Sequence, residues 1–316
     1  MHRKRAFRPP PGGRQMNAAF AIDVRYYRLS EPLQPYFTAL YAFEFQCAPG
    51  QVIEDYLHPE WTQLRFVRGV PPIASVGPGP LKEQWPFVAS GPTSRSIHFG
   101  ITTGEVWGLG LQPAGWAKFA QGSARAIADS TVDGSTHPSF ALFAPIQRMV
   151  EESDSDLDTM AARINDYLMG HADRPLKNEH LIFACQEALR DPEVANVSQL
   201  GERLGLGARS LERFCSRHFG FPPKLLLRRQ RFLRSLAQFM LDPARTWSKA
   251  MDGQYYDQAQ FVRDFRSFMD MTPSEYADTP HPILEKIMAQ RMADQGAAPQ
   301  TDLPTVLRYT ADPERE

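Results

Sequence analysis

The 316-residue sequence has little cysteine, no long apolar run and no strong excess of either charge. Its three cysteines, Cys47, Cys185 and Cys215, are odd in number and widely spaced, which argues against a disulfide framework and favours a reducing compartment. No stretch approaches the roughly 18 apolar residues that a membrane-spanning helix needs, and no apolar segment follows the basic residues 1–14. We therefore expect a cytoplasmic protein that does not enter a membrane.

The near-neutral balance, a formal net charge of -1, means that overall charge gives no indication of nucleic-acid binding. Hydrophobic residues make up 42% and aromatic residues 11% of the chain, which is enough to build cores and excludes wholesale disorder. The length is that of two ordinary domains with tails. Any signal for a charged partner must therefore come from the distribution of charge along the chain.

The chain divides into two regions that differ in their sequence pattern. Short β-prone runs separated by Pro and Gly come first and predict an antiparallel sheet or barrel, and helical periodicity follows. The fold class expected is therefore α+β and multidomain, with a β-rich N-terminal domain and an all-α C-terminal domain. The expected boundaries are 1–18 for a disordered basic tail, 19–135 for a β-rich sensor or dimerisation domain, 136–174 for a helical linker, 175–280 for a DNA-binding domain and 281–316 for a partly disordered tail, with Met1 and Met16 as alternative starts.

A helix, a tight turn and a second helix are predicted between Asn196 and His218. Asn196 followed by Gln199 is a capping-box pattern for the start of the first helix. The sequence GLG at 205–207 breaks that helix, because glycine tolerates positive φ. The second helix, from Ala208 to His218, carries arginines on the face opposite its apolar stripe. This arrangement is typical of a helix-turn-helix unit.

A second unit of the same kind is predicted over residues 247–276. Asp257 is a suitable N-cap for a helix that runs to about Met269, with phenylalanines on its core face. Its other faces carry Gln and Arg, the side chains that make bidentate contacts with adenine and guanine edges in the major groove. This second helix is therefore also expected to contact DNA.

One predicted helix, residues 222–241, separates the two units. Nineteen helical residues measure about 28 Å, and adjacent major-groove faces are about 34 Å apart, so this helix would place the two recognition helices in consecutive grooves. Between Arg203 and Arg234 there are nine Lys or Arg residues and one acid, Glu212, a local net charge of +8. The segment is expected to bind phosphates in a salt-dependent manner.

Residues from about 197 to 276 resemble the AraC/XylS family of transcriptional regulators. LERFCSRHFG resembles the first recognition helix of the family and its exit, and YYDQAQFVRDFRSFMDMTPSEY resembles the second helix and the closing motif. Three residues depart from the family pattern: Cys215 replaces an aromatic residue, Lys249 an apolar residue and Gln254 a glycine. The resemblance implies a sequence-specific regulator that reads two consecutive major grooves of double-stranded promoter DNA.

The resemblance also implies which side chains contact DNA. Base edges would be read by Arg209, Glu212, Arg213, Gln258, Ala259, Val262 and Arg263. Phosphates would be held by Arg217, Lys224, Arg228, Arg229 and Arg266.

The β-rich domain more weakly resembles the cupin-like sensor barrel of some family members, which implies that it binds a small effector, dimerises or does both. Trp61, Arg65, Phe99 and Trp107 are candidates for lining an effector pocket, with Arg65 as an anion anchor; the alternative is that these aromatic residues are simply core. His58, Glu60 and His98 lack the clustered His-x-His pattern of a cupin metal site. No metal, cofactor or catalytic residue is therefore expected.

Two other functions remain open at this point. The chain could be a cupin-like enzyme with a helical appendage, which stoichiometric bound metal would indicate. It could instead be an adaptor whose helical domain binds protein, which failure to bind any duplex would indicate. For the preferred regulator, RNA polymerase, an unidentified small effector and a second copy of the chain are candidate partners.

Overall fold

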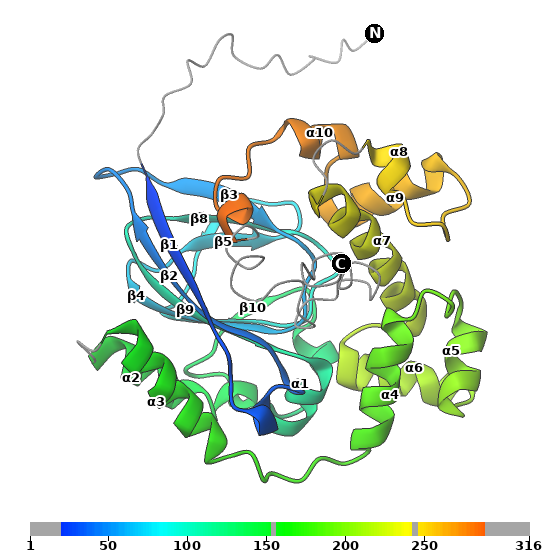
Figure 1. The fold of residues 1–316 in the computed structure, drawn as a ribbon, viewed down its shortest axis with the longest axis horizontal. Helices are drawn as coiled ribbons and strands as arrows, with labels where there is room; N and C mark the ends of the chain where they lie inside the picture. Colours follow the sequence, from blue (N-terminus) through cyan, green and yellow to red (C-terminus); the bar gives the residue numbers. More distant parts are fainter. Residues whose placement is uncertain (1–19, 153–155, 242–245, 288–316) are drawn as a thin grey trace, which may run out of the picture.

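The computed structural model describes residues 20–152, 156–241 and 246–287. They form a β-rich N-terminal domain followed by a helical C-terminal domain (Figure 1), which confirms the predicted order of the two domains. The predicted tail at 1–18 and the part of the predicted tail beyond 287 lie outside these residues.

The N-terminal domain contains two antiparallel sheets that face each other. The larger has the order β1-β2-β9-β4-β7-β10 and the smaller the order β3-β8-β5-β6. Their strands are β1 (Ala21–Tyr27), β2 (Phe37–Gln46), β3 (Ile53–Leu57), β4 (Gln63–Gly69), β5 (Ile73–Val76), β6 (Lys82–Glu83), β7 (Phe87–Ser90), β8 (Ile97–Ile101), β9 (Gly104–Leu111) and β10 (Thr131–Asp133).

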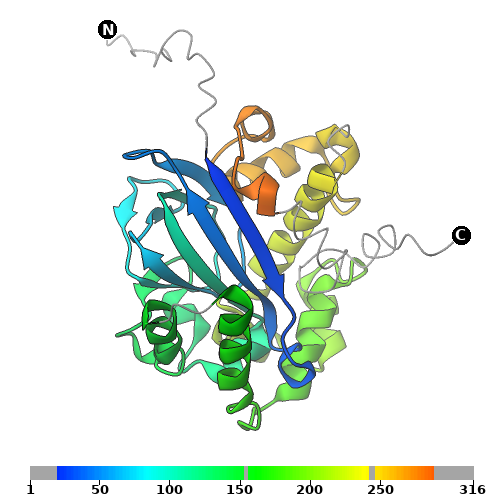
Figure 2. The same ribbon diagram turned by 60° about the vertical axis from the view of Figure 1, so that its left-hand side comes forward.

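The expected barrel is not closed, because no strand of one sheet pairs with a strand of the other in the described part of the chain. Two of the edge strands, β6 and β10, have only 2 and 3 residues, too short to extend a ladder between the sheets. The C-terminal domain lies beside the two sheets (Figures 1 and 2).

Helices cover the lower part of the N-terminal domain. Three helices lie between residues 113 and 169, and two of them, α2 and α3, lie on the outer side of the larger sheet (Figure 1). Asp156 caps α3 by accepting hydrogen bonds from the amides of Asp158 and Thr159. The elements are α1 (Pro113–Phe119), α2 (Ala144–Glu152) and α3 (Leu157–Met169), with single 3-10 turns η1 (Glu31–Leu33), η2 (Ala124–Ile127) and η3 (Pro138–Phe140).

The C-terminal domain is a chain of helices joined by short turns. The predicted capping box between Asn196 and Gln199 is present at the start of α5, and Gly205 ends that helix with φ 64°. A residue with a side chain would be strained at this φ, so glycine is what lets α6 follow so closely. The helices are α4 (Glu179–Arg190), α5 (Val197–Leu204), α6 (Ala208–Phe219), α7 (Pro223–Leu241), α8 (Trp247–Ala250), α9 (Gln258–Met269) and α10 (Pro273–Asp278).

The hydrophobic cores do not follow the domain boundary. One cluster runs without interruption from the larger sheet and α1–α4 into the first helix-turn-helix unit, where it includes Leu200, Leu211 and Phe219. The second unit has a cluster of its own, built around Phe232 and Phe265. The helix α7 belongs to both, since Leu226 lies in the first cluster and Phe232 in the second.

The segment after α10 returns to the N-terminal domain, where the sequence predicts a tail. Asp55, at 1% exposure, accepts hydrogen bonds from the amides of Ile283 and Leu284, and lies 2.9 Å from Nδ1 of His281. Ile283 and Leu284 are buried, and residues 284–287 form a helical turn beside the strands (Figure 1). Residues 281–287 are thus part of the fold, because a buried carboxylate on β3 holds them.

Candidate DNA-binding surface and interdomain cavity

The helix α6 presents a polar face to solvent. Leu211, Phe214, Cys215 and Phe219 are buried on its inner side, so the residue that replaces the family's aromatic is a core residue here. Arg209, Glu212 and Arg213 are exposed on the opposite side. Arg217 and Lys224, two of the predicted phosphate contacts, are exposed as well. All five predicted side chains are therefore exposed, four on α6 and Lys224 at the start of α7.

The helix α9 presents a similar face. Its N-cap is Asp257, whose carboxylate accepts a hydrogen bond of 2.6 Å from the amide of Gln260. Four of the side chains predicted to reach DNA are exposed and one is half-buried: Gln258, Ala259, Arg263 and Arg266 are exposed and Val262 is half-buried. Tyr256, which the sequence reasoning did not single out, is 94% exposed immediately before the cap.

The arginines of α7 are paired or enclosed, although Arg228 remains partly exposed. Nη2 of Arg228 lies 2.6 Å, and Nη2 of Arg231 lies 3.0 Å, from opposite oxygens of the Asp264 carboxylate. Nε of Arg234 lies 2.6 Å from Asp252, and both side chains are nearly buried. Asp252 and Asp264 lie after the basic segment 203–234 in the sequence. The net charge of that segment therefore does not include the two acids that pair with its arginines.

Arg229, a predicted phosphate contact, is buried instead of exposed. It has 0% exposure, and its guanidinium carbon lies 3.7 Å from the centroid of the Trp61 ring. Nη1 donates to the carbonyl oxygens of Thr93 and Glu60, at 3.0 and 3.4 Å. In this structure Arg229 holds α7 against the β-rich domain.

Gln254, at the position where the family has glycine, takes part in the turn of the second unit. Its backbone amide donates to Asp252, and its side-chain oxygen accepts from Arg234 at 3.0 Å. Lys249 is exposed on the short helix α8. Both departures from the pattern are thus accommodated without a buried unpaired charge.

The end of α9 is held by the β-rich domain. The amide of Ser96 donates to the carbonyl oxygen of Phe268 at 2.7 Å, and Arg95 pairs with Asp270 at 2.7 Å. His58 lies 2.8 Å from the hydroxyl of Tyr276 on α10. The position of the second unit therefore depends on polar contacts with the N-terminal domain.

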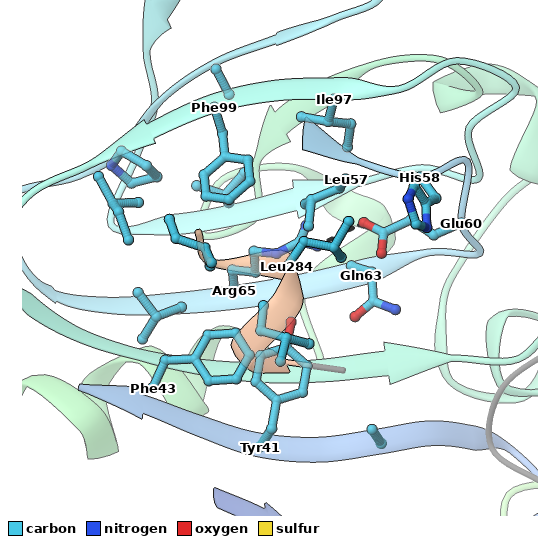
Figure 3. Close-up of a pocket in the computed structure, with 18 of the residues that line it drawn as sticks. Tyr41, Phe43, Leu57, His58, Glu60, Gln63, Arg65, Ile97, Phe99 and Leu284 are labelled. Atoms are coloured by element: carbon cyan, nitrogen blue, oxygen red, sulfur yellow. Dashed lines mark hydrogen bonds and ion pairs between the residues drawn. The ribbon is translucent and has the colours of Figure 1, made fainter. Parts of the chain in front are cut away.

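A cavity of about 270 Å³ lies between the two sheets and the C-terminal domain. Figure 3 shows Ile97 and Phe99 on one side, Tyr41 and Phe43 on the other, and Leu284 between them. The second half of α7 contributes further lining residues, Leu233, Leu236, Ala237 and Met240. A Cβ at Gly108 would lie 1.8 Å from the Tyr41 ring, so this glycine is what allows that ring to lie flat over β9.

Three of the four side chains predicted to line an effector pocket line this cavity: Trp61, Arg65 and Phe99. Trp107 does not, because it points to the other side of the larger sheet. It has 0% exposure, stacks on Tyr27 and donates to Glu105 at 2.8 Å. Side-chain alternation along β9 separates Trp107 from the cavity.

Two charged groups of the cavity, Arg65 and Glu60, are paired with each other. Nη2 of Arg65 lies 2.6 Å from Oε1 of Glu60 (Figure 3), with side-chain exposures of 17% and 22%. Enclosure between the domains lowers the pKa of His58 to about 4, with a smaller contribution from nearby His281. A histidine with this pKa is neutral at pH 7.

The three residues considered as metal ligands in the sequence each contact a different side chain. His58 contacts Tyr276, Glu60 pairs with Arg65, and His98 lies 2.9 Å from Glu54 while stacking on Tyr56. In the described ranges, no group of three or more His, Cys, Asp or Glu side chains is arranged to hold a metal ion. No helix there is long and apolar enough to cross a membrane.

Residues 200–279 match a family of proteins described as a helix-turn-helix domain. The match covers both units, so the C-terminal domain is a DNA-binding module of the helix-turn-helix class. The domain is of the AraC type, which confirms the predicted resemblance, and the chain is a DNA-binding transcription regulator. No protein with a curated function matches the chain.

Among solved structures, the chain is similar to ToxT from Vibrio cholerae, with 8% identity and a TM-score of 0.42 over 82% of this chain and 98% of that one. A structure of ToxT from the same organism with a bound unsaturated fatty acid gives 8% identity and a TM-score of 0.37, over 84% and 97% of the two chains. The AraC-like transcriptional activator CuxR gives 13% identity and a TM-score of 0.28, over 69% and 87%.

The most informative residues that sequence reasoning missed are Asp55, Asp252 and Asp264. Asp264 carries a usable signal, because it lies on the same helical face as Phe261, Phe265 and Phe268. An acid on a core stripe must be paired, and arginines spaced three apart on a neighbouring helix are suitable partners. Asp55 and Asp252 carry no such signal, since their partners are distant or in turns.

Proposed function

We propose that this regulator reads two consecutive major-groove segments of promoter DNA, with α6 in one and α9 in the next, and that a small molecule bound in the interdomain cavity controls it. The observation that carries the DNA-reading part is the pair of twelve-residue helices α6 and α9, each buried on one side and exposing arginine on the other. Arg213 and Arg263 can each donate two hydrogen bonds to the edge of a guanine, because the guanidinium group is forked.

The test uses the full chain and an operator selected from random duplexes. Arg213→Ala and Arg263→Ala are each expected to weaken operator binding by about 1–3 kcal/mol with little effect on random DNA. Arg174→Ala is a matched control, because Arg174 is exposed but lies outside both units. An equal loss on operator and random DNA would contradict base reading, and binding to no duplex at low salt would favour the adaptor function.

The distance between the two DNA half-sites tests whether α6 and α9 occupy consecutive grooves. Inserting about 5 base pairs between the two half-sites rotates one by half a turn and should abolish tight binding, whereas about 10 base pairs keeps the same face but adds a turn. A rigid α7 predicts that both insertions weaken binding. Full binding after the insertion of 10 base pairs would show that the two units move freely.

The control by a small molecule is supported by the composition of the cavity wall, which includes β strands, α7 and residues 281–287. A molecule in this space contacts the DNA-binding domain directly and can bias its placement only through unequal contacts in two arrangements. A cytoplasmic location and contact with RNA polymerase or a second copy of the chain are part of the same proposal. Bound metal, which would favour the enzyme alternative, is checked by elemental assay of the purified chain.

A further inference from the structure

The interdomain cavity has an apolar wall and balanced charge. Most of its lining side chains are aliphatic or aromatic, and they come from both sheets, from α7 and from the segment after α10. Among the described residues that line it, only Glu60 and Arg65 carry a formal charge at neutral pH once His58 is neutral. These two charges sum to zero.

The two charges also satisfy each other. The Arg65–Glu60 contact of 2.6 Å is a charge-assisted hydrogen bond between largely buried groups, and Nη1 of Arg65 lies 3.4 Å from the hydroxyl of Ser90. A carboxylate or phosphate that took Arg65 would leave the Glu60 carboxylate buried without its partner, which is strongly unfavourable. A cation would meet the same obstacle, because Glu60 already holds Arg65.

Apolar groups also line the side of the cavity that faces the C-terminal domain. Ile283 and Leu284 are held over it by the hydrogen bonds from their amides to Asp55, and Leu284 points between the two sheets (Figure 3). On the other side Leu236 and Ala237 of α7 complete the wall. No charged side chain of the described ranges faces the space from these two elements, so an entering ligand gains mainly apolar contacts.

We propose that the cavity binds a neutral, predominantly apolar molecule rather than an organic anion. The inference rests on the proposed control by a small molecule and specifies the chemical class of that molecule. It replaces the role expected for Arg65 as an anion anchor, because Glu60 occupies that position. The bound molecule contacts α7 in the half that belongs to the core of the second helix-turn-helix unit.

The test measures binding to the full chain without DNA. The neutral fluorescent probe N-phenyl-1-naphthylamine is titrated at pH 7.5 and then displaced with decan-1-ol or with decanoate, which differ in charge but share the same alkyl chain length. We expect saturable 1:1 binding of the probe and displacement by the alcohol at a concentration at least about tenfold below that of the carboxylate. Equal or preferential displacement by decanoate, or the absence of saturable probe binding, overturns the proposal.

Two variants test the reason for the preference. Glu60→Gln removes the negative charge and leaves Arg65 without its counter-charge, so decanoate should gain at least about tenfold relative to decan-1-ol. Ala237→Phe fills the space beside α7 and should abolish probe binding, with circular dichroism to check that the chain is folded. No shift toward decanoate in Glu60→Gln would overturn the charge argument even if Ala237→Phe failed to fold.

This design separates the ligand class from the DNA-reading function. A chain that prefers decanoate yet binds its operator contradicts only the ligand class. A chain that binds the alcohol but no duplex contradicts only the proposed DNA reading.

Discussion

At the scale of single residues, acidic side chains decide which basic side chains are free for DNA. Asp264 pairs with Arg228 and Arg231, and Asp252 pairs with Arg234, whereas the arginines on α6 and on the outer face of α9 remain exposed. A segment with a net charge of +8 in the sequence therefore does not produce a uniformly basic surface. The pairing concentrates the exposed positive charge on the two helices that the DNA-reading proposal requires.

Replacing Asp264 by Ala should destabilise the second helix-turn-helix unit. The side chain is 4% exposed and bonds both arginines, so its loss leaves two guanidinium groups without their acceptor. We expect a loss of about 3 kcal/mol, at the low end for a broken buried pair because Arg228 is partly exposed. Urea unfolding measures it, with the exposed Asp278→Ala as a control that should change stability by less than about 0.5 kcal/mol. Equal effects of the two substitutions would rule out a structural role for Asp264.

His58 should make the fold sensitive to acid. Its pKa is about 4 in the folded chain, where burial disfavours the charged form, and 6.5 is the ordinary value. The unfolded chain therefore binds more protons between pH 6.5 and 4, and the folded state loses stability as pH falls through this window. Asp55 and His281 lie nearby, and the first of these partly opposes the shift.

The measurement is the free energy of unfolding at pH 7 and at pH 5. His58→Gln should lose less stability on acidification than the original chain, although His218, whose pKa burial also lowers to about 4, keeps part of the effect. His180→Gln, at an exposed position, is the matched control and should behave like the original chain. An unchanged acid loss in His58→Gln would argue that the ring is not neutral in the folded chain.

At the scale of elements, local signals predicted the helices well. The capping box at Asn196, the glycine turn at Gly205 and the N-cap at Asp257 all involve residues within a few positions of one another, and each is present in the structure. The orientation of α7 depends instead on Asp264 and on the carbonyls of Thr93 and Glu60, which are 33 to 169 residues distant from their arginine partners. A helix pattern shows which residues are polar, but not which of them meets a distant acid.

The residues around the cavity show the same limit of prediction from local sequence. Trp61, Arg65 and Phe99 were predicted to line a pocket and do so, while Trp107 points to the opposite face of its strand. Residues 281–287 appeared to be a tail, because the signal that orders them is a buried carboxylate more than two hundred positions away on β3. Closure of the sheets was overestimated for a related reason, since the pairing of edge strands is not local.

The burial of Arg229 on α7 leads to a prediction about the salt dependence of DNA binding. Lys224 is exposed near its start, whereas Arg229 is enclosed against Trp61. Lys224→Ala should lower the slope of log K against log salt concentration by about 0.9, the value for one phosphate contact on B-DNA. Arg229→Met should leave the slope unchanged while weakening the contact between α7 and the β-rich domain. Equal reductions of the slope would mean that Arg229 leaves its site and reaches a phosphate in the complex.

At the scale of the whole molecule, the two DNA-binding units are attached differently. The first shares one continuous core with the β-rich domain, through Leu211, Phe219 and Leu226. The second has a separate core and contacts the β-rich domain through polar groups such as Ser96 and Arg95. The cavity is bounded by α7 and residues 281–287, on the side of the second unit. The proposed ligand would therefore change the placement of α9 while α6 stays fixed to the β-rich domain.

This division predicts two steps of local opening in native-state hydrogen exchange. Amides of α9, such as those of Phe265 and Phe268, should exchange through opening of the second unit alone, at a lower free energy than amides of α6, such as those of Phe214 and Cys215. The amides of β9 serve as an internal reference and should exchange together with α6. Saturation with a ligand of the cavity should raise the opening free energy of α9 toward that of α6 and leave α6 unchanged, because the ligand binds only the closed arrangement. A single opening free energy for α6, α9 and β9 without ligand would show that the units form one cooperative body, in spite of their separate cores.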